Sequence, residues 1–295
     1  MIYQVARIFC LDFGSEGVAV GDCAHDHGMF AYDPIFPQIG VDDLSSAITD
    51  DDVLIANPSF SHFNFGLNCR GRKLMYAQGF NTFSLIDPLF DRYVAASRVV
   101  NRLLAGVYDI ETKIIPPFIG AENFASPSPW RSRRPASVLM SGKSPPHLVA
   151  ELCRRLAAKG LEPTFEQPFG RKTPHEEIIA RMGEYRYFLT LSPAEGFGLM
   201  PLEAMAMGCV VMGFDGYGGR DYMSPDLNCA VTRYGDFGGL ASRIARALGD
   251  ENFAASLACA GRATGMDPGY HYDRFRDAWR REIDEFLKQP RAFRT

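Results

Sequence analysis

The stretch from Ser192 to Met212, SPAEGFGLMPLEAMAMGCVVM, constrains the fold more than any other part of the chain. The apolar run at 187–191 leads into it and predicts a buried strand. A glycine-containing turn follows. Pro201 is expected at the first helical position, because a helix start does not use the N–H that proline lacks, and a short helix continues over 202–207. A second apolar run at 209–212 predicts the next strand, so the stretch is typical of an open α/β sheet.

Two carboxylates in this stretch point to a ligand. Glu195 lies in the turn and Glu203 in the first helical turn, so both are expected above the carboxyl end of the strand, where open α/β sheets bind ligands. The backbone amides of 196–199 and the helix N-terminus suit a phosphate, and a carboxylate accepts hydrogen bonds from sugar hydroxyls. The alternative is that Glu203 only offsets the helix dipole, that Glu195 is a solvated loop carboxylate and that the glycines only shape turns.

The same string resembles the signature of the retaining glycosyltransferases of family 4, the "group 1" transferases. In that family a Glu, seven residues and a second Glu frame a GFGLP-like turn. The resemblance implies a GT-B fold, in which two Rossmann-like, doubly wound parallel-sheet domains face a cleft and the C-terminal helix crosses back to the first domain. It implies a reduced acceptor-side domain at 1–120 that the helix at 270–295 joins, and a nucleotide-sugar-binding domain at 136–269. The segment 121–135, rich in Pro, Ser and Arg, is the expected linker.

Composition narrows the class of protein. The chain of 295 residues is long enough for two domains, and its net charge of −4 gives no reason to expect a nucleic acid partner. The seven cysteines have no CxxC spacing, which favours reduced thiols over disulfides or a zinc site. Neither a signal peptide nor a run of eighteen apolar residues is found. We therefore expect a cytoplasmic protein that would reach a lipid acceptor from the inner membrane surface, as a peripheral contact.

Local patterns in the first half predict individual elements. Weak alternation predicts a first strand over 2–11, and 53–56 and 73–78 predict two more. The triple Asp at 50–52 is interpreted as a solvated turn before a strand, with a metal site as the alternative. Ser97 is expected to cap the helix that follows it.

The resemblance also identifies acceptor-side candidates. In the family, the strand that matches 73–78 often ends in a His near the reacting sugar, and Gln78 stands at that position. Gln hydrogen-bonds a hydroxyl but cannot act as a base. His62 and Asn64 follow the preceding strand, and His62 is either an ordinary surface histidine or a functional one.

On the donor side, the strand expected at 137–140 leads to Lys143, which matches a family Arg that clamps the pyrophosphate. A Lys supplies a point charge rather than a fork, and the family's second basic residue is missing. Either Arg220 or Arg171 compensates, or the donor is held less tightly. The resemblance thus assigns the catalytic role to Glu195, Gln78 and His62, with no metal. It assigns donor binding to Lys143, Gly196, Phe197, Gly198, Leu199, Glu203, Gly218, Gly219 and Arg220.

Three further expectations concern helices of the second half. Thr173 and Asp236 are predicted to cap the helices that follow them. Apolar residues at spacings of three and four over 270–287 predict an amphipathic helix that packs into a core.

The function implied by the resemblance is the transfer of a sugar, of hexosyl type, from a nucleotide-diphosphate sugar to a hydroxyl of a glycan or glycolipid, with retention of configuration. No cofactor beyond the donor is expected, and polysaccharide biosynthesis is the expected setting. The leaving phosphate helps to deprotonate the acceptor in this family, which makes Gln78 tolerable. Two alternatives remain open: a nucleotide-sugar epimerase of the same fold, and a non-catalytic pseudo-transferase that acts as a binding or scaffold subunit.

Overall fold

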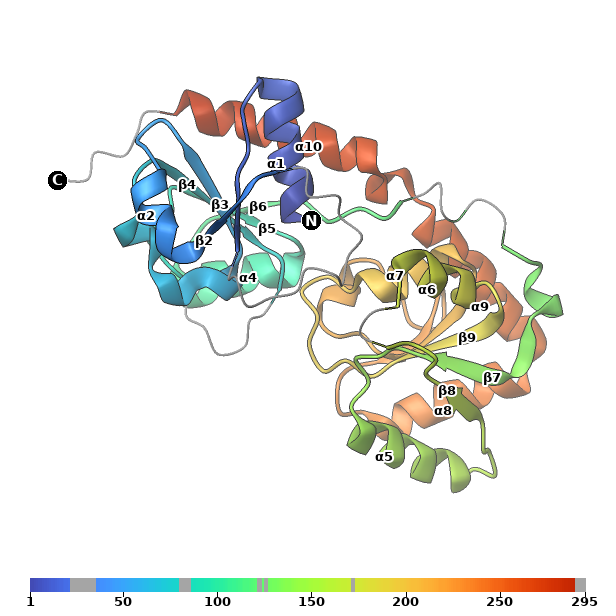
Figure 1. Cartoon of the computed structure of the whole chain (residues 1–295). Coiled ribbons are helices and arrows are strands. Elements are labelled where there is room, and N and C mark those ends of the chain that lie inside the picture. Colours follow the sequence, from blue (N-terminus) through green and yellow to red (C-terminus); the bar gives the residue numbers. More distant parts are fainter. Residues whose placement is uncertain (22–35, 80–85, 121–123, 125–126, 171–172, 290–295) are drawn as a thin grey trace. The chain divides into compact units, whose positions relative to one another are not determined.

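The computed structural model describes residues 1–21, 36–79, 86–120, 124, 127–170 and 173–289 (Figure 1). The chain divides into two compact units. The first comprises Met1–Pro117 together with Asp273–Thr295, and the second comprises Phe118–Tyr272. Within the described residues, no helix has the length and apolar composition needed to cross a membrane.

The first unit contains a four-stranded parallel sheet whose strands stand in chain order. They are β3 (Val53–Ala56), β4 (Arg72–Ala77), β5 (Arg92–Ala95) and β6 (Lys113–Ile114). A separate parallel pair is formed by β1 (Ala19–Gly21) and β2 (Gln38–Gly40). The helices of this part of the chain are α1 (Ile2–Phe13), α2 (Leu44–Ala47), α3 (Phe65–Asn68) and α4 (Arg98–Tyr108). The strands predicted at 53–56 and 73–78 are confirmed.

The strand predicted at 2–11 is wrong, because this segment is helix α1. Its buried side chains are Val5, Ile8 and Phe9, which are three and four positions apart and so share one helical face. The helix ends at Gly14, whose φ of 68° is left-handed. The weak alternation of apolar residues therefore came from a helical stripe.

Two local predictions in the first unit are confirmed. The triple Asp lies in the turn between α2 and β3, where Asp52 Oδ2 accepts from both the backbone N and the Oγ1 of Thr49 at 2.7 Å. Ser97 caps α4, since its Oγ accepts from the backbone N of Val100 at 3.3 Å.

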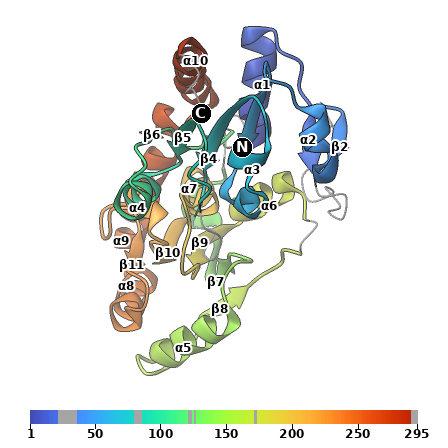
Figure 2. The ribbon, with the colours of Figure 1, turned by 90° about the vertical axis from the view of Figure 1, so that its left-hand side faces the viewer.

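The C-terminal helix α10 (Tyr272–Lys288) packs on the first unit, as Figures 1 and 2 show. Its apolar stripe is buried, which confirms the prediction of an amphipathic helix. Trp279 meets the ring of Tyr76 on β4 edge to face, with ring centres 4.9 Å apart. The Tyr76 hydroxyl in turn donates to the carbonyl of Ile115 at 2.9 Å, so the helix is held against the middle of the sheet.

A buried carboxylate adds an ionic contact to this packing. Glu282 of α10 is 1% exposed and lies 3.2 Å from Arg92 Nη1 and 3.0 Å from Lys113 Nζ. Lys113 also pairs with the exposed Glu285. Because water barely reaches Glu282, these two cations supply the charge compensation that its burial requires.

The second unit contains a five-stranded parallel sheet with the order β11-β10-β9-β7-β8. Its strands are β7 (Arg134–Met140), β8 (Thr164–Glu166), β9 (Tyr185–Thr190), β10 (Val210–Phe214) and β11 (Ala230–Thr232). The order reverses between β7 and β9, which are adjacent in the sheet. A crevice forms at such a switch point, outside the carboxyl ends of the strands, and it is where ligands bind in open α/β sheets.

Helices cover both faces of this sheet, and the strand residues divide between them with period two. Val138, Tyr187, Leu189, Val210 and Met212 pack with α5 (Pro146–Ala157) and α8 (Phe237–Gly249). On the other face, Leu139, Phe188 and Val211 pack with α6 (His175–Met182) and α7 (Leu199–Ala206). Helix α9 (Glu251–Gly265) packs beside α7 and α8. The sheet is therefore doubly wound, as predicted.

The helix starts in the second unit differ in part from the predictions. Helix α7 begins at Leu199, so Pro201 is its third residue, still within the turn whose N–H groups have no partner inside the helix. Thr173 does not cap α6: Pro174 precedes the helix without a side-chain cap, and Thr173 Oγ1 accepts from Gly170 instead. The cap by Asp236 is confirmed, with Gly239 N donating at 2.8 Å.

We expect Glu282→Ala to lower the free energy of unfolding by about 3 kcal/mol, because the partly buried Arg92 loses the buried carboxylate with which it pairs. Denaturant unfolding followed by circular dichroism measures this loss. The matched control is Glu285→Ala, which removes an exposed partner of the same Lys113 and should cost less than about 1 kcal/mol. Equal losses for the two variants would contradict the assigned role of the buried carboxylate.

Candidate active site

The strand-order reversal brings two of the predicted residues together. Lys143 follows β7 and Glu195 follows β9, and Lys143 Nζ lies 3.1 and 3.2 Å from the two carboxylate oxygens. Ser144 joins the same two loops, since its Oγ accepts from the backbone N of Leu191 at 3.1 Å. A cation and a carboxylate thus meet at the switch point of the sheet.

The loop of Glu195 is joined to the loop after β10 by backbone hydrogen bonds. Glu195 N donates to Gly216 O at 2.7 Å, and Gly218 N donates to Glu195 O at 3.0 Å. A Cβ on Gly218 would lie 2.5 Å from Glu195 O and from the carbonyl carbon of Gly196. Position 218 therefore accepts only glycine if the two loops are to stay this close.

Between these glycines, Tyr217 adopts a strained backbone. Its φ of 65° and ψ of −53° lie in a region that residues with a Cβ rarely adopt, and Gly218 N donates to Gly216 O at 2.8 Å across it. This is a γ-turn of the rare positive-φ type, which costs free energy in a non-glycine residue. The guanidinium of Arg220 lies 4.6 Å from the centre of the Tyr217 ring. Strain of this kind gathers at functional sites, and here it is next to Glu195.

Glu203 is the fifth residue of α7 and is 8% exposed; it lies beyond the first helical turn, where it was predicted, because the helix already begins at Leu199. Its Oε1 is 2.7 Å from Nε2 of His175, the first residue of α6. The hydrogen bond to Glu203 raises the pKa of His175 above its usual value, against the opposite effect of partial burial. His175 was not among the site residues predicted from the sequence. A polar residue at a helix start, two elements before the signature, was the available signal.

Tyr222 supports the glycine turn from the protein interior. Its buried hydroxyl donates to the carbonyl of Gly198, and its ring packs against Phe197 with centres 5.3 Å apart. Burial raises the pKa of Tyr222 strongly, and the charges of Glu195 and Glu203 raise it further. Both carboxylates therefore act on this one phenol.

Phe197 and Arg220 are placed differently from simple donor contacts. The side chain of Phe197 is 3% exposed and belongs to the core, so only its backbone is left for a ligand. The Arg220 guanidinium binds Asp215, with Nε 2.7 Å from Oδ2. Arg171, the other cation considered for the phosphates, lies outside the described residues.

His62 and Gln78 lie in the first unit, whereas the donor-side residues lie in the second. Gln78 directly follows β4, and its Nε2 is buried without a hydrogen-bond partner in the part of the chain that the structure describes. His62 is exposed in a 3-10 segment, Pro58–Phe63, after β3, and its ring centre lies 4.0 Å from that of Phe63. Both follow the carboxyl ends of neighbouring strands, and their role on the acceptor side stays a prediction.

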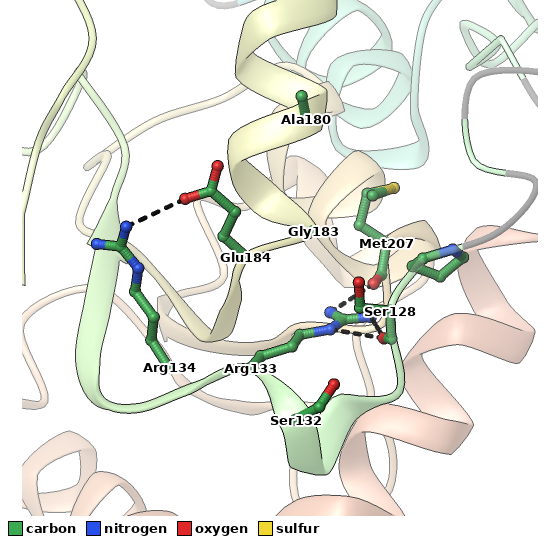
Figure 3. A pocket seen from close by; sticks show the side chains of 9 residues that line it. Ser128, Ser132, Arg133, Arg134, Ala180, Gly183, Glu184 and Met207 are labelled. Atoms are coloured by element: carbon green, nitrogen blue, oxygen red, sulfur yellow. Dashed lines mark hydrogen bonds and ion pairs between the residues drawn. The ribbon is translucent and has the colours of Figure 1, made fainter.

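A hollow of about 440 Å³ lies at the other end of the second sheet, near the amino ends of β7, β9 and β10 (Figure 3). Arg133 in its wall donates to the carbonyls of Ser128 and Met207 at 2.7 to 2.9 Å. Arg134 pairs with Glu184 at 3.3 Å. These cations are engaged by the protein itself, and Arg133 binds a carbonyl at the C-terminal end of α7.

The described ranges of the chain hold no group of three His, Cys, Asp or Glu side chains placed to bind a metal ion.

The second unit is similar in sequence to known proteins. Residues 135–264 match the family model "Glycosyl transferases group 1". A segment of 42 residues is 50% identical to an alpha-1,6-glucosyltransferase of Actinobacillus pleuropneumoniae serotype 7 (strain AP76). That segment makes up 14% of this chain and 13% of the glucosyltransferase.

Solved structures with the same fold are also known. A sucrose-phosphate synthase from Thermosynechococcus elongatus aligns over 97% of this chain and 92% of its own, with a TM-score of 0.71 and 14% identity. The S. aureus protein TarM, crystallised as a mutant with fondaparinux, alpha-GlcNAc-glycerol and UDP, aligns over 83% of this chain with a TM-score of 0.63 and 14% identity. This chain spans 57% of the length of TarM. The fold is that of the GT-B glycosyltransferases, as predicted.

We expect Tyr217→Gly to be more stable to unfolding than Tyr217→Ala by about 1 kcal/mol. Both variants remove the ring and its contact with Arg220, but only glycine adopts the positive φ without strain. A glycine variant is normally less stable than the alanine variant at the same position, so a more stable glycine variant would indicate backbone strain at residue 217. Urea unfolding of the two variants measures it, and a more stable alanine variant would show that the γ-turn is not strained.

Proposed function

We propose that this protein is a glycosyltransferase that binds a nucleotide-diphosphate sugar at the carboxyl edge of the sheet in its second unit. The observation that carries the proposal is the meeting of Lys143 and Glu195 at the strand-order reversal, with Glu203 on the next helix. The group 1 match over 135–264 supports it. UDP in the TarM complex supports a nucleotide as the ligand.

Each donor group has a proposed partner. Lys143 binds the pyrophosphate, and the amides of Gly196, Phe197, Gly198 and Leu199 bind phosphate and sugar oxygens at the uncapped start of α7. Glu203 accepts from the ribose hydroxyls, Glu195 from the sugar hydroxyls, and Gly218 and Gly219 let the backbone approach the donor. Arg220, bound to Asp215, acts by holding the Tyr217 loop next to the donor. In the absence of donor Lys143 is paired with Glu195, so the diphosphate competes with that carboxylate for the ammonium group.

The proposed reaction retains the configuration of the transferred sugar and uses no metal or cofactor. The acceptor hydroxyl attacks on the face from which the diphosphate leaves, and the departing phosphate oxygen takes the acceptor proton. Lys143 and the amides at the start of α7 stabilise the charge that develops on the leaving group. Gln78 and His62 orient the acceptor by hydrogen bonding. The increase in reaction rate therefore comes from the positioning of the substrates and from the stabilisation of charge.

For the acceptor we propose a glycan or glycolipid hydroxyl, with a hexose as the transferred sugar and polysaccharide synthesis in the cytoplasm, at the inner membrane surface, as the setting. The hexose is supported by the matched segment of an alpha-1,6-glucosyltransferase. The glycan acceptor is supported by alpha-GlcNAc-glycerol in the TarM complex.

The test is thermal unfolding with UDP, GDP, ADP, CDP and dTDP. We expect one nucleotide at 100 times its dissociation constant to stabilise the protein by roughly 2.7 kcal/mol, a shift of several degrees. Glu203→Ala should abolish the shift, because the ribose loses its acceptor, whereas the exposed Glu162→Ala should keep it.

The outcomes separate this proposal from its rivals. No shift with any nucleotide would favour a non-catalytic subunit. Turnover of the donor sugar without an acceptor, at the rate found with one, would favour an epimerase. Product anomers resolved by NMR test retention, and activity in EDTA tests metal independence.

A further inference from the structure

His175 and Glu203 form a directed pair between two helices that cover the same face of the sheet. The carboxylate of Glu203 is almost buried, whereas half of the His175 side chain is exposed. A carboxylate only accepts hydrogen bonds, so Nε2 of His175 carries the hydrogen and donates it to Oε1 at 2.7 Å. Oε2 of Glu203 takes no part in this bond. The imidazole therefore sits at the solvent edge of the carboxylate assigned to the ribose.

We propose that His175 is a positioning residue of the nucleotide site, which holds the Glu203 carboxylate in the orientation that receives the ribose hydroxyls of a nucleoside diphosphate. The inference rests on the proposed function, and it adds a residue and a pH dependence to it. A Glu side chain has several rotamers, and ordering them at the moment of binding lowers affinity. His175 orders the carboxylate before the nucleotide arrives.

The charges that act on His175 come from two helices. Glu203 of α7 raises the pKa of His175 through the hydrogen bond, Glu176 of α6 raises it through its charge, and partial burial lowers it. The net direction is upward from the usual 6.5. An imidazolium is therefore retained at pH values where a free histidine has lost its proton.

Strand β9, on which α6 also packs, adds no competing charge. Tyr185 donates to Glu166 at 2.6 Å, and Arg186 pairs with Glu251 at 3.0 Å. Tyr187 donates to a backbone carbonyl of α8 at 3.2 Å. Each titratable side chain of this strand is thus engaged away from His175.

The sign of the pH effect follows from the raised pKa. Below that pKa the bond joins an imidazolium to a carboxylate, and such charge-assisted bonds are stronger than neutral ones. As the pH rises through it, the bond weakens and a positive charge that attracts the diphosphate is lost. Affinity for the nucleotide therefore falls as the pH rises through the raised pKa of His175.

The experiment is calorimetric titration from about pH 6 to about pH 9, with the tightest-binding nucleotide of the five tested above. His175→Gln keeps an amide donor but does not titrate, so the ratio of its dissociation constant to that of the wild type cancels ionisation of the nucleotide itself. We expect this ratio to be roughly threefold near pH 6 and to approach one near pH 9. His175→Ala should weaken binding about tenfold near pH 6.

A structural role is distinguished by two further readouts. His175→Ala should raise KM for the donor and leave kcat nearly unchanged, whereas a partly unfolded population lowers the apparent kcat and leaves KM unchanged. Glu177→Gln removes a charge from the same helical turn without touching Glu203, and it should keep the wild-type pH profile. If His175→Ala does not fold, the Gln variant carries the test alone.

A ratio that stays constant over the whole pH range would overturn this inference while nucleotide binding itself persists, which leaves the proposed function intact. If none of the five nucleotides binds the wild type at any pH, the inference falls together with the proposed function.

Discussion

The close approach of the chain after β9 and β10 is the constraint on which the rest of the second unit depends. At the strand ends, a Cβ on Gly213 would lie 1.8 Å from the carbonyl oxygen of Thr190. In the loops that follow, Glu195 shares backbone hydrogen bonds with Gly216 and Gly218, and a Cβ on Gly218 would again collide with its neighbours. Two glycines thus allow one sheet edge to carry a carboxylate, a strained tyrosine and a helix start within a few ångströms.

Helix α7 is the element that this edge presents, and it is held at both ends. At its start, Gly198 has a φ of 88° and no side-chain cap, and its carbonyl is bound by Tyr222. At its end, Arg133 donates to Met207 O and Arg262 donates to Ala206 O, so the last carbonyls are satisfied by cations rather than by water. The start of the helix therefore has no side-chain cap, while the negative end of the helix dipole is neutralised.

The first unit depends on a segment from the far end of the chain. Helix α10 covers the sheet with an aromatic stripe and with the buried Glu282, and Arg72 on β4 donates to the carbonyls of its last turn. This unit is consequently not complete until the whole chain has been made. In the part of this unit that the structure describes, the four strands follow one another in order without a reversal, unlike those of the sheet that carries Lys143 and Glu195.

Much of this was determined by the sequence alone, wherever the signal is local. The strand–turn–helix–strand order around Glu195, the caps at Ser97 and Asp236 and the stripe of α10 depend on residues a few positions apart, and all were predicted. The first helix was mistaken for a strand because its apolar spacing fits both periods over a short run. The cap expected at Thr173 was wrong because its hydroxyl binds the preceding loop instead.

Only the tertiary structure decided which of the candidate residues meet. The contacts of Lys143 with Glu195 and of His175 with Glu203 join residues that are 52 and 28 positions apart. Local sequence patterns do not predict contacts between residues this far apart in the chain. The burial of Phe197 and the ion pair of Arg220 with Asp215 could not be predicted from the sequence either, because both depend on which side chains the neighbouring elements place around them. The sequence determined the chemistry that is available, and the strand order of the sheet determined which groups share a site.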